Sequence, residues 1–204
     1  MTAVRVLLVS ASPRRRAILG MLGLEPRVVE PGAVERRHLL PEPPAAFVVA
    51  QAEAKLRTAG ALSPGWMALA ADTVVVLDGR VMGKPEDPAE AREMLRALSG
   101  RTHEVVTGVA VSHADAVAAG WEVTRVAFRT LAEEDVRRYV AGGEPLDKAG
   151  AYGIQGAGAA LVRGVEGCYF NVVGLPVVKL LELLGEVGLR YDLRGAILGS
   201  EITG

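Results

Sequence analysis

A basic turn near the N-terminus is the segment whose residue types point most directly to chemistry, Ser10-Ala11-Ser12-Pro13-Arg14-Arg15-Arg16. Ser12 suits an N-cap and Pro13 the first position of a helix. Arg14 and Arg15 then fall in the first turn, where the helix dipole already presents partial positive charge. A bound anion would explain that placement. The segment therefore predicts a phosphate site, with an ordinary basic surface turn as the alternative. Because successive helical residues point about 100° apart, Arg16 is predicted to face solvent.

A carboxylate and a hydroxyl, Asp72 and Thr73, interrupt the apolar run Ala68 to Leu77. The apolar neighbours predict a buried strand, and burying an unpaired charge is costly. Asp72 therefore needs a cationic partner, a metal ion or a reaction, unless it lies at a strand end and caps a loop. Carboxylate oxygens are ligands that Mg²⁺ prefers, and Glu35, in the polar stretch Glu25 to Pro44, is a second candidate.

Two lysines offer point charges for a phosphate. Lys84 lies in Gly83-Lys84-Pro85, just past a predicted hairpin strand, and Lys55 lies on a predicted helix with one apolar face. A loop lysine is usually solvated, and a lysine on such a helix usually lies at the rim with its stem buried. Each lysine is therefore a weak signal taken singly.

A glycine-rich segment, Asp147 to Gly158, follows in the second half of the chain. Its glycines would let the main chain approach a ligand closely. Gln155 carries both a donor and an acceptor, which suits it to reading the edge of a nucleobase. Neither the Walker pattern nor the Rossmann fingerprint is present, so the segment predicts a site without naming its ligand.

Composition and charge argue against several classes of protein. Twenty-three Lys and Arg against twenty-four Asp and Glu leave a formal charge of −1, which gives no overall attraction to nucleic acid or anionic lipid. The single cysteine, Cys168, excludes an intrachain disulfide framework, and the three histidines lack metal-ligand spacing. No window has the roughly 18 to 20 apolar residues of a membrane span, and no signal-peptide core precedes the first strand. We expect a cytoplasmic protein that binds neither nucleic acid nor membrane.

The elements that must position these residues alternate along the chain. Strands are predicted at 4–9, 68–77, 104–112, 121–130 and 160–165, and a strand followed by a loop within 25–44. A hairpin partner is predicted at 81–82 after Asp78-Gly79, and a small-residue loop is predicted to join the strands at 104–112 and 121–130. Helices are predicted at 13–22, around 48–56 and from 88 to about 98. Two more are predicted from just after Thr130 to about 140 and from 176 to about 184. Asp87 with Glu90, and Thr130 with Glu133, are predicted to cap two of them. This order predicts an α/β fold with a mixed sheet.

Taken in order, the motifs closely resemble the Maf family. The resemblance is carried by Ser10-x-Ser12-Pro13-Arg14-Arg15, Ala71-Asp72-Thr73-Val74, Gly83-Lys84-Pro85, Thr102-His103-x-Val105-x-Thr107-Gly108, Asp147-Lys148-Ala149-Gly150-Ala151-Tyr152-Gly153-Ile154-Gln155-Gly156 and Asn171-Val172-Val173-Gly174-Leu175-Pro176. It extends from residue 7 to about residue 185. It implies one Maf-type domain over residues 1–204, with an elongated mixed β-sheet, flanking helices and two lobes around a central nucleotide-binding cleft, related to the inosine triphosphate pyrophosphatases.

The resemblance also implies an activity. Members of the family hydrolyse nucleoside triphosphates to the monophosphate and pyrophosphate and need a divalent metal, here Mg²⁺ or Mn²⁺. The branch with Asp-Lys-Ala-Gly-Ala-Tyr-Gly-Ile-Gln-Gly acts on dTTP and UTP, and this chain is similar to that branch, so modified pyrimidine triphosphates are further candidates. The alternatives are a 7-methyl-GTP pyrophosphatase and a non-catalytic nucleotide-binding regulator of cell division. Asp72 argues against the latter, because a pure binder gains nothing from a carboxylate near polyphosphate.

Residue roles follow from the resemblance at matching positions. Asp72 is expected to accept the proton and to bind the metal, with Glu35 as the second metal ligand. Base choice is expected to depend on Arg14, Thr73 and Gln155. The expected phosphate binders are Ser10, Arg15, Lys55 and Lys84. The implied partner is the nucleoside triphosphate; the sequence does not give the oligomeric state, and a homodimer is one option.

Overall fold

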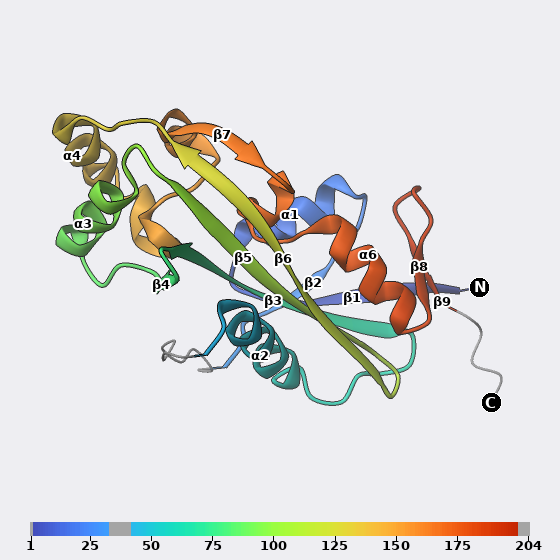
Figure 1. Ribbon diagram of the computed structural model, residues 1–204. Coiled ribbons are helices and arrows are strands. Elements are labelled where there is room, and N and C mark those ends of the chain that lie inside the picture. The colour runs from blue at the N-terminus through green and yellow to red at the C-terminus, as the bar shows by residue number, and fades with distance from the viewer. Residues whose placement is uncertain (1, 33–41, 200–204) are drawn as a thin grey trace. The chain divides into compact units, whose positions relative to one another are not determined.

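The computed structural model describes residues 2–32 and 42–199 (Figure 1). The predicted metal ligand Glu35 lies outside these residues. The described strands are β1 Thr2–Val9, β2 Arg27–Val29, β3 Trp66–Leu77, β4 Arg80–Met82, β5 Thr102–His113, β6 Ala116–Phe128, β7 Val162–Glu166, β8 Leu189–Tyr191 and β9 Ile197–Gly199. The α-helices are α1 Pro13–Met21, α2 Pro44–Arg57, α3 Pro88–Leu98, α4 Glu133–Ala141, α5 Tyr169–Val173 and α6 Val177–Glu186, and the 3₁₀ helices are η1 Glu144–Asp147, η2 Ala149–Ala151 and η3 Gly156–Leu161.

The strands form a mixed sheet, as predicted. Its order is β7-β6-β5-β3-β1-β9-β8, with β2 paired to β1 and β4 paired to β3. β1 runs parallel to β2 and β3 but antiparallel to β9. The parallel pairs follow from the long crossovers that carry α1 and α2, whereas the two-residue turn Asp78-Gly79 makes β4 antiparallel to β3. Both turn residues have positive φ, 51° and 76°, which is the geometry of the predicted hairpin turn.

The chain divides into two compact units. Unit 1 comprises residues 1–72, 107–122 and 174–204, and unit 2 comprises residues 73–106 and 123–173. β3, β5 and β6 each contribute residues to both units. One domain with two lobes around a cleft stays a prediction.

Unit 1 is built on a strand and a helix in close contact. The apolar end of β1 is buried, and Val9 packs in one cluster with Ala52 and Leu56 of α2 and with small residues of β3. On β5, Gly108 faces α2 so closely that an added Cβ would overlap the main-chain carbonyl group of Val48. Only glycine lets the helix approach the strand to this distance, which sets where the side chains of α2 lie.

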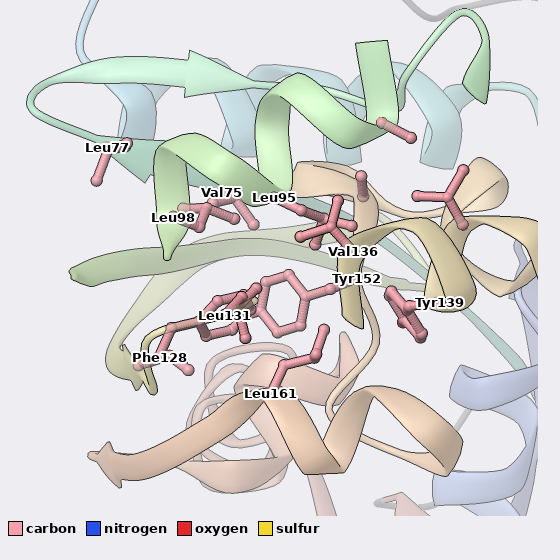
Figure 2. Packing of buried hydrophobic residues seen from close by; sticks show 14 of the residues in the cluster. Val75, Leu77, Leu95, Leu98, Phe128, Leu131, Val136, Tyr139, Tyr152 and Leu161 are labelled. Carbon is pink, nitrogen blue, oxygen red and sulfur yellow. The ribbon is translucent and has the colours of Figure 1, made fainter. Parts of the chain in front are cut away.

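Unit 2 has an apolar core that draws on α3, α4 and the strands of this unit (Figure 2). His103, Phe128 and Tyr152 stack edge to face within it, with ring centroids 4.7 to 5.3 Å apart. Figure 2 shows Tyr152 at the centre of the cluster. The glycine-rich segment is therefore anchored in this core through Tyr152, at its middle.

One predicted cap is confirmed and the other is wrong. Asp87 accepts hydrogen bonds from the main-chain N–H groups of Ala89 and Glu90, at 2.7 and 2.8 Å, although Glu90 bonds back to Glu86 rather than to Asp87. Thr130 does not cap α4, because the N-cap residue is Ala132, whose N–H donates to the Asp135 carboxylate at 3.3 Å. α4 begins at Glu133, so Asp135 takes the third helical position that the sequence assigned to Glu133, and it also accepts from Arg129.

The short elements α5, β8 and β9, the three 3₁₀ helices and one strand extension were not predicted. α5, β8 and β9 have three to five residues each, too few for periodicity to reveal them. The predicted small-residue loop is wrong in part, since β6 begins at Ala116 and only Ala114 and Asp115 form the turn. Alanine has low strand propensity, and pairing in the sheet overrides it here. Within residues 2–32 and 42–199, no helix has both the length and the apolar character to span a membrane.

Candidate functional site

The turn after β1 is organised by Ser10. Ser10 is 3% exposed, and its main-chain N–H donates to the Val29 carbonyl at 3.0 Å. Its hydroxyl oxygen accepts hydrogen bonds from the Ser12 N–H and from Nη1 of Arg15, both at 3.1 Å. Ser12 is the N-cap residue of α1, as predicted, but its side chain makes no capping bond. The hydroxyl of Ser10 thus joins the strand end to the helix start.

The three arginines of the turn differ in burial. Arg16 is exposed, as predicted, Arg14 is half-buried and Arg15 is buried. Besides its bond to Ser10, Arg15 donates from Nε to the carbonyl oxygen of Gly174 at 2.8 Å. Two of its five N–H donors are therefore committed to the chain itself. The guanidinium braces the turn as well as offering charge to an anion.

Lys55 and Asp72 form a buried ion pair. Nζ of Lys55 lies 2.7 Å from Oδ1 of Asp72, and the two side chains are 7% and 14% exposed. Lys55 is in the last turn of α2, and Asp72 is inside β3, five residues before its end. The alternative of a rim lysine is wrong, because close packing at Gly108 brings α2 onto the sheet and Lys55 is buried. The alternative of a strand-end cap is also wrong for Asp72, because β3 continues past it.

The register of β1 and β3 places the Ser10 turn beside Asp72 in unit 1. Val9 pairs with Ala70 in the parallel ladder, so the turn that begins at Ser10 lies beside the step from Ala71 to Asp72. The carboxyl ends of parallel strands are the usual position of ligand sites in α/β sheets. The serine hydroxyl and the guanidinium of the Ser10 turn therefore lie at the carboxyl end of β1, beside the segment of β3 that carries Asp72 and its partner Lys55.

The chemistry of Asp72 fits a divalent cation. Lys55 occupies Oδ1, and Oδ2 is the oxygen that a cation or a water would use. Mg²⁺ is usually held by one or two carboxylates together with phosphate oxygens and water, so a single protein carboxylate suffices. No group of three or more His, Cys, Asp and Glu side chains gathers anywhere in the described part of the chain.

Three predicted site residues belong to unit 2. Thr73 is half-buried on β3 directly after Asp72, and side chains of successive strand residues point to opposite faces. Lys84 is exposed just past β4, and Gln155 is exposed at the start of η3. The structure therefore brings Ser10 to Arg15 and Lys55 to Asp72 within unit 1.

Two further motifs serve the fold. His103 and Tyr152 belong to different motifs, and Nε2 of the histidine lies 2.7 Å from the tyrosine hydroxyl. Burial lowers the pKa of His103 to about 4, so the imidazole is neutral near pH 7. In the last motif, the amide of Asn171 donates to the Val105 carbonyl and to the hydroxyl of Thr124, at 2.9 and 3.0 Å. The sequence placed His103, Tyr152 and Asn171 in motifs of the family resemblance but did not reveal these hydrogen bonds.

Gly174 is a site residue that the sequence did not predict. Its carbonyl accepts the bond from Arg15, and its φ of 117° lies in the region that favours glycine. The only signal was its place in the motif ending at Pro176. A partner 159 residues away in the sequence cannot be inferred from local pattern.

Comparisons with known proteins agree on one family. A family model described as Maf-like protein matches residues 5–187. A dTTP/UTP pyrophosphatase of Moorella thermoacetica is 53% identical over 190 residues, covering 91% of this chain and 96% of the relative. One of Anaeromyxobacter dehalogenans is 50% identical over 191 residues, covering 91% and 95%. Among solved structures, a HAM1 protein from Coxiella burnetii aligns with a TM-score of 0.41 and 21% identity over 61% of this chain and 73% of that one, too remote to support an argument.

Proposed function

We propose, from the premise that this chain belongs to the Maf-like protein family, that it hydrolyses dTTP and UTP to the monophosphate and pyrophosphate. It is a nucleoside triphosphate pyrophosphatase that acts on the bond between the α and β phosphates. The observation in the fold that best supports this function is the buried pair of Lys55 and Asp72 beside the Ser10 turn. A buried carboxylate among cationic groups suits the handling of an anionic substrate.

Asp72 orients a water molecule and takes its proton. The oxygen of that water forms a bond to the α phosphorus as the bond to the bridging oxygen breaks, and pyrophosphate leaves on the opposite side. The bond from Lys55 fixes Oδ1, so the carboxylate cannot rotate freely and Oδ2 keeps one direction. Such fixed orientation is worth several orders of magnitude when reacting groups must align.

Positive charge offsets the charge of the triphosphate. Arg15 and Lys55 supply it from unit 1 and Lys84 from unit 2, and the Ser10 hydroxyl supplies a further polar contact for a phosphate oxygen. A bound Mg²⁺ or Mn²⁺, held by Asp72 and Glu35, would add charge neutralisation at the phosphate oxygens. Phosphoryl-type displacement depends mainly on such positioning and charge stabilisation.

Base choice depends on Gln155, together with Arg14 and Thr73. The amide of Gln155 can pair with a carbonyl and an N3–H on the same pyrimidine edge. A wrong base leaves these polar groups without partners, which lowers its rate by a large factor. Cytosine has the reverse donor pattern at these positions and serves as the closest negative control.

A substrate panel tests the proposed function. Pyrophosphate release is measured for dTTP, UTP, dCTP, dGTP, 7-methyl-GTP and modified pyrimidine triphosphates, with Mg²⁺, with Mn²⁺ and with excess EDTA. We expect dTTP and UTP to be hydrolysed fastest, and EDTA to abolish the reaction. A preference for 7-methyl-GTP would overturn the substrate assignment, and no release from any triphosphate would overturn the enzymatic role.

The composition of the chain supports a proposal for its cellular compartment and its partners. The near-zero net charge and single cysteine support a cytoplasmic enzyme without nucleic-acid or membrane partners. A homodimer is proposed as its assembly, and light scattering after size-exclusion chromatography measures the mass that decides between dimer and monomer.

A further inference from the structure

The carboxylate of Glu144, in unit 2, points toward main-chain N–H groups of the loop around Gln155. Glu144 begins η1 and is half-buried. Its Oε2 accepts from the Ala157 N–H at 3.2 Å, and its Oε1 accepts from the Gly158 N–H at 3.4 Å. One carboxylate therefore holds the loop on the C-terminal side of Gln155. We call residues 153–158 the Gln155 loop.

The hydroxyl of Tyr139 completes the attachment on the other side. It donates to Oε1 of Glu144 at 2.9 Å and accepts from the Gly153 N–H at 3.1 Å. Burial of the ring raises the pKa of the Tyr139 hydroxyl, so the group stays protonated and remains a donor. Both sides of the Gln155 loop are thus bound to one pair of side chains, Tyr139 and Glu144, which we call the loop clamp.

The glycines of the loop fit it against the clamp. A Cβ at Gly158 would overlap the carbonyl oxygen of Gly153 and would come within 2.6 Å of the Tyr139 hydroxyl. A Cβ at Gly156, where φ is 68°, would lie 3.1 Å from Oε2 of Glu144. At least part of the glycine content therefore serves close packing of the loop on itself and on the clamp, which differs from the flexibility that glycine alone would suggest.

Lys148 in turn holds Glu144, one of the two clamp residues. Its Nζ donates to the main-chain carbonyl of Glu144 and to Oδ1 of Asp147, both at 2.5 Å, and its side chain is mostly buried. A Cβ at Gly153 would lie 2.9 Å from Cε of Lys148, so the lysine stem also packs against the loop. The charged residues that open the glycine-rich motif are therefore committed to building the loop.

We infer that Tyr139 and Glu144 are positioning residues that hold the Gln155 loop in the conformation that selects a uracil or thymine base. The inference rests on the proposed function, because it concerns how that site chooses its substrate. Gln155 itself is exposed and lies between the two attachment points. A loop fixed on both sides loses less conformational freedom on binding, and it keeps the main chain that carries Gln155 from shifting to suit a wrong base.

Tyr139→Phe and Glu144→Gln test the inference. The first removes the hydroxyl that links Glu144 to Gly153, and the second replaces an acceptor oxygen with an amide group. Tyr191→Phe and Glu134→Gln are matched controls. The Tyr191→Phe variant also loses a hydroxyl hydrogen bond, which the hydroxyl makes to the Leu22 carbonyl in unit 1. Glu134 is a surface carboxylate of α4 that pairs with arginines.

The decisive measurement is the ratio of kcat/KM for dTTP to that for dCTP. In both clamp variants we expect this ratio to fall about tenfold, mainly through a higher KM for dTTP, while both controls keep the wild-type ratio. The double variant should lose no more than either single variant, since both side chains act on one loop. Amide hydrogen exchange across residues 153–158 should accelerate in the clamp variants alone.

The possible outcomes distinguish a failure of the proposed function from a failure of the loop-clamp inference. A wild-type protein that hydrolyses neither dTTP nor UTP would overturn the proposed function, and this inference with it. An active wild type whose clamp variants are less stable but keep the dTTP to dCTP ratio would overturn the inference alone. Unchanged hydrogen exchange across the loop in both clamp variants would do the same, because the clamp would then not hold it.

Discussion

The polar residues of the two units are held in different ways. In unit 1, Lys55 and Asp72 bind each other directly, and both side chains are almost fully buried. In unit 2, Gln155 is exposed, and its position depends on main-chain bonds that the loop clamp makes around it. A group that handles protons gains from burial because its orientation is fixed, whereas a group that reads a base must reach a ligand from the surface.

The largest expected effect comes from breaking the pair in unit 1. Asp72→Asn keeps the shape and an acceptor for Lys55 but removes the proton acceptor, so kcat for dTTP should fall by about 10³-fold or more. The exposed turn residue Asp115 provides the control, and Asp115→Asn should leave kcat unchanged. Steady-state kinetics with circular dichroism decide the matter: a folded Asp72→Asn protein with near wild-type turnover would exclude Asp72 from the chemistry.

A second variant disrupts the packing that positions the pair of Lys55 and Asp72. Gly108→Ala forces α2 away from β5, and we expect a loss of about 3 kcal/mol in the free energy of unfolding, with reduced activity as Lys55 moves. Gly20→Ala is the control, because Gly20 is exposed on α1 and has open space around it. Urea denaturation should show that this control gains up to about 1 kcal/mol. Equal stability of Gly108→Ala and wild type would contradict the close approach of α2.

Unit 2 should be the more sensitive to mild acid. The pKa of His103 falls from an ordinary value of 6.5 to about 4 on folding, because burial disfavours the charged imidazole. The neutral form is favoured in the fold, so this stability is complete above pH 6.5 and is lost as the pH falls toward 4. The loss amounts to about 2 kcal/mol by pH 5. Urea denaturation at pH values from 7 to 5 should show this loss in the free energy of unfolding in the wild type but not in His103→Gln.

The smallest effect is expected at the surface of unit 2. Arg96 and Glu133 pair between α3 and α4, but the two side chains are 48% and 64% exposed. Solvent screens such a pair, so Arg96→Gln should leave the urea midpoint within error of the wild type. A clear shift would show that exposed ion pairs matter in this fold, and it would weaken the contrast drawn from the buried pair of unit 1.

Local pattern was sufficient for much of the fold. The first strand, turn and helix, the hairpin at Asp78-Gly79 and the cap at Asp87 were all predictable, because each depends on residues a few positions apart. The cap of α4 was predicted wrongly, because Glu133 and Asp135 both suit the third helical position and local pattern does not decide between them. The helix α5 and the strands β8 and β9 are too short to leave a periodic signal.

The site was predictable as a list of residues but not as an arrangement. The sequence by itself determined that Asp72 needs a partner, because a carboxylate in an apolar strand is costly to bury alone. Only the tertiary structure decided that the partner is Lys55, since that pairing depends on the register of β1 with β3 and on the approach of α2 at Gly108. Charge and hydrogen bonding act through space, and the chain reaches those distances only after its strands have paired.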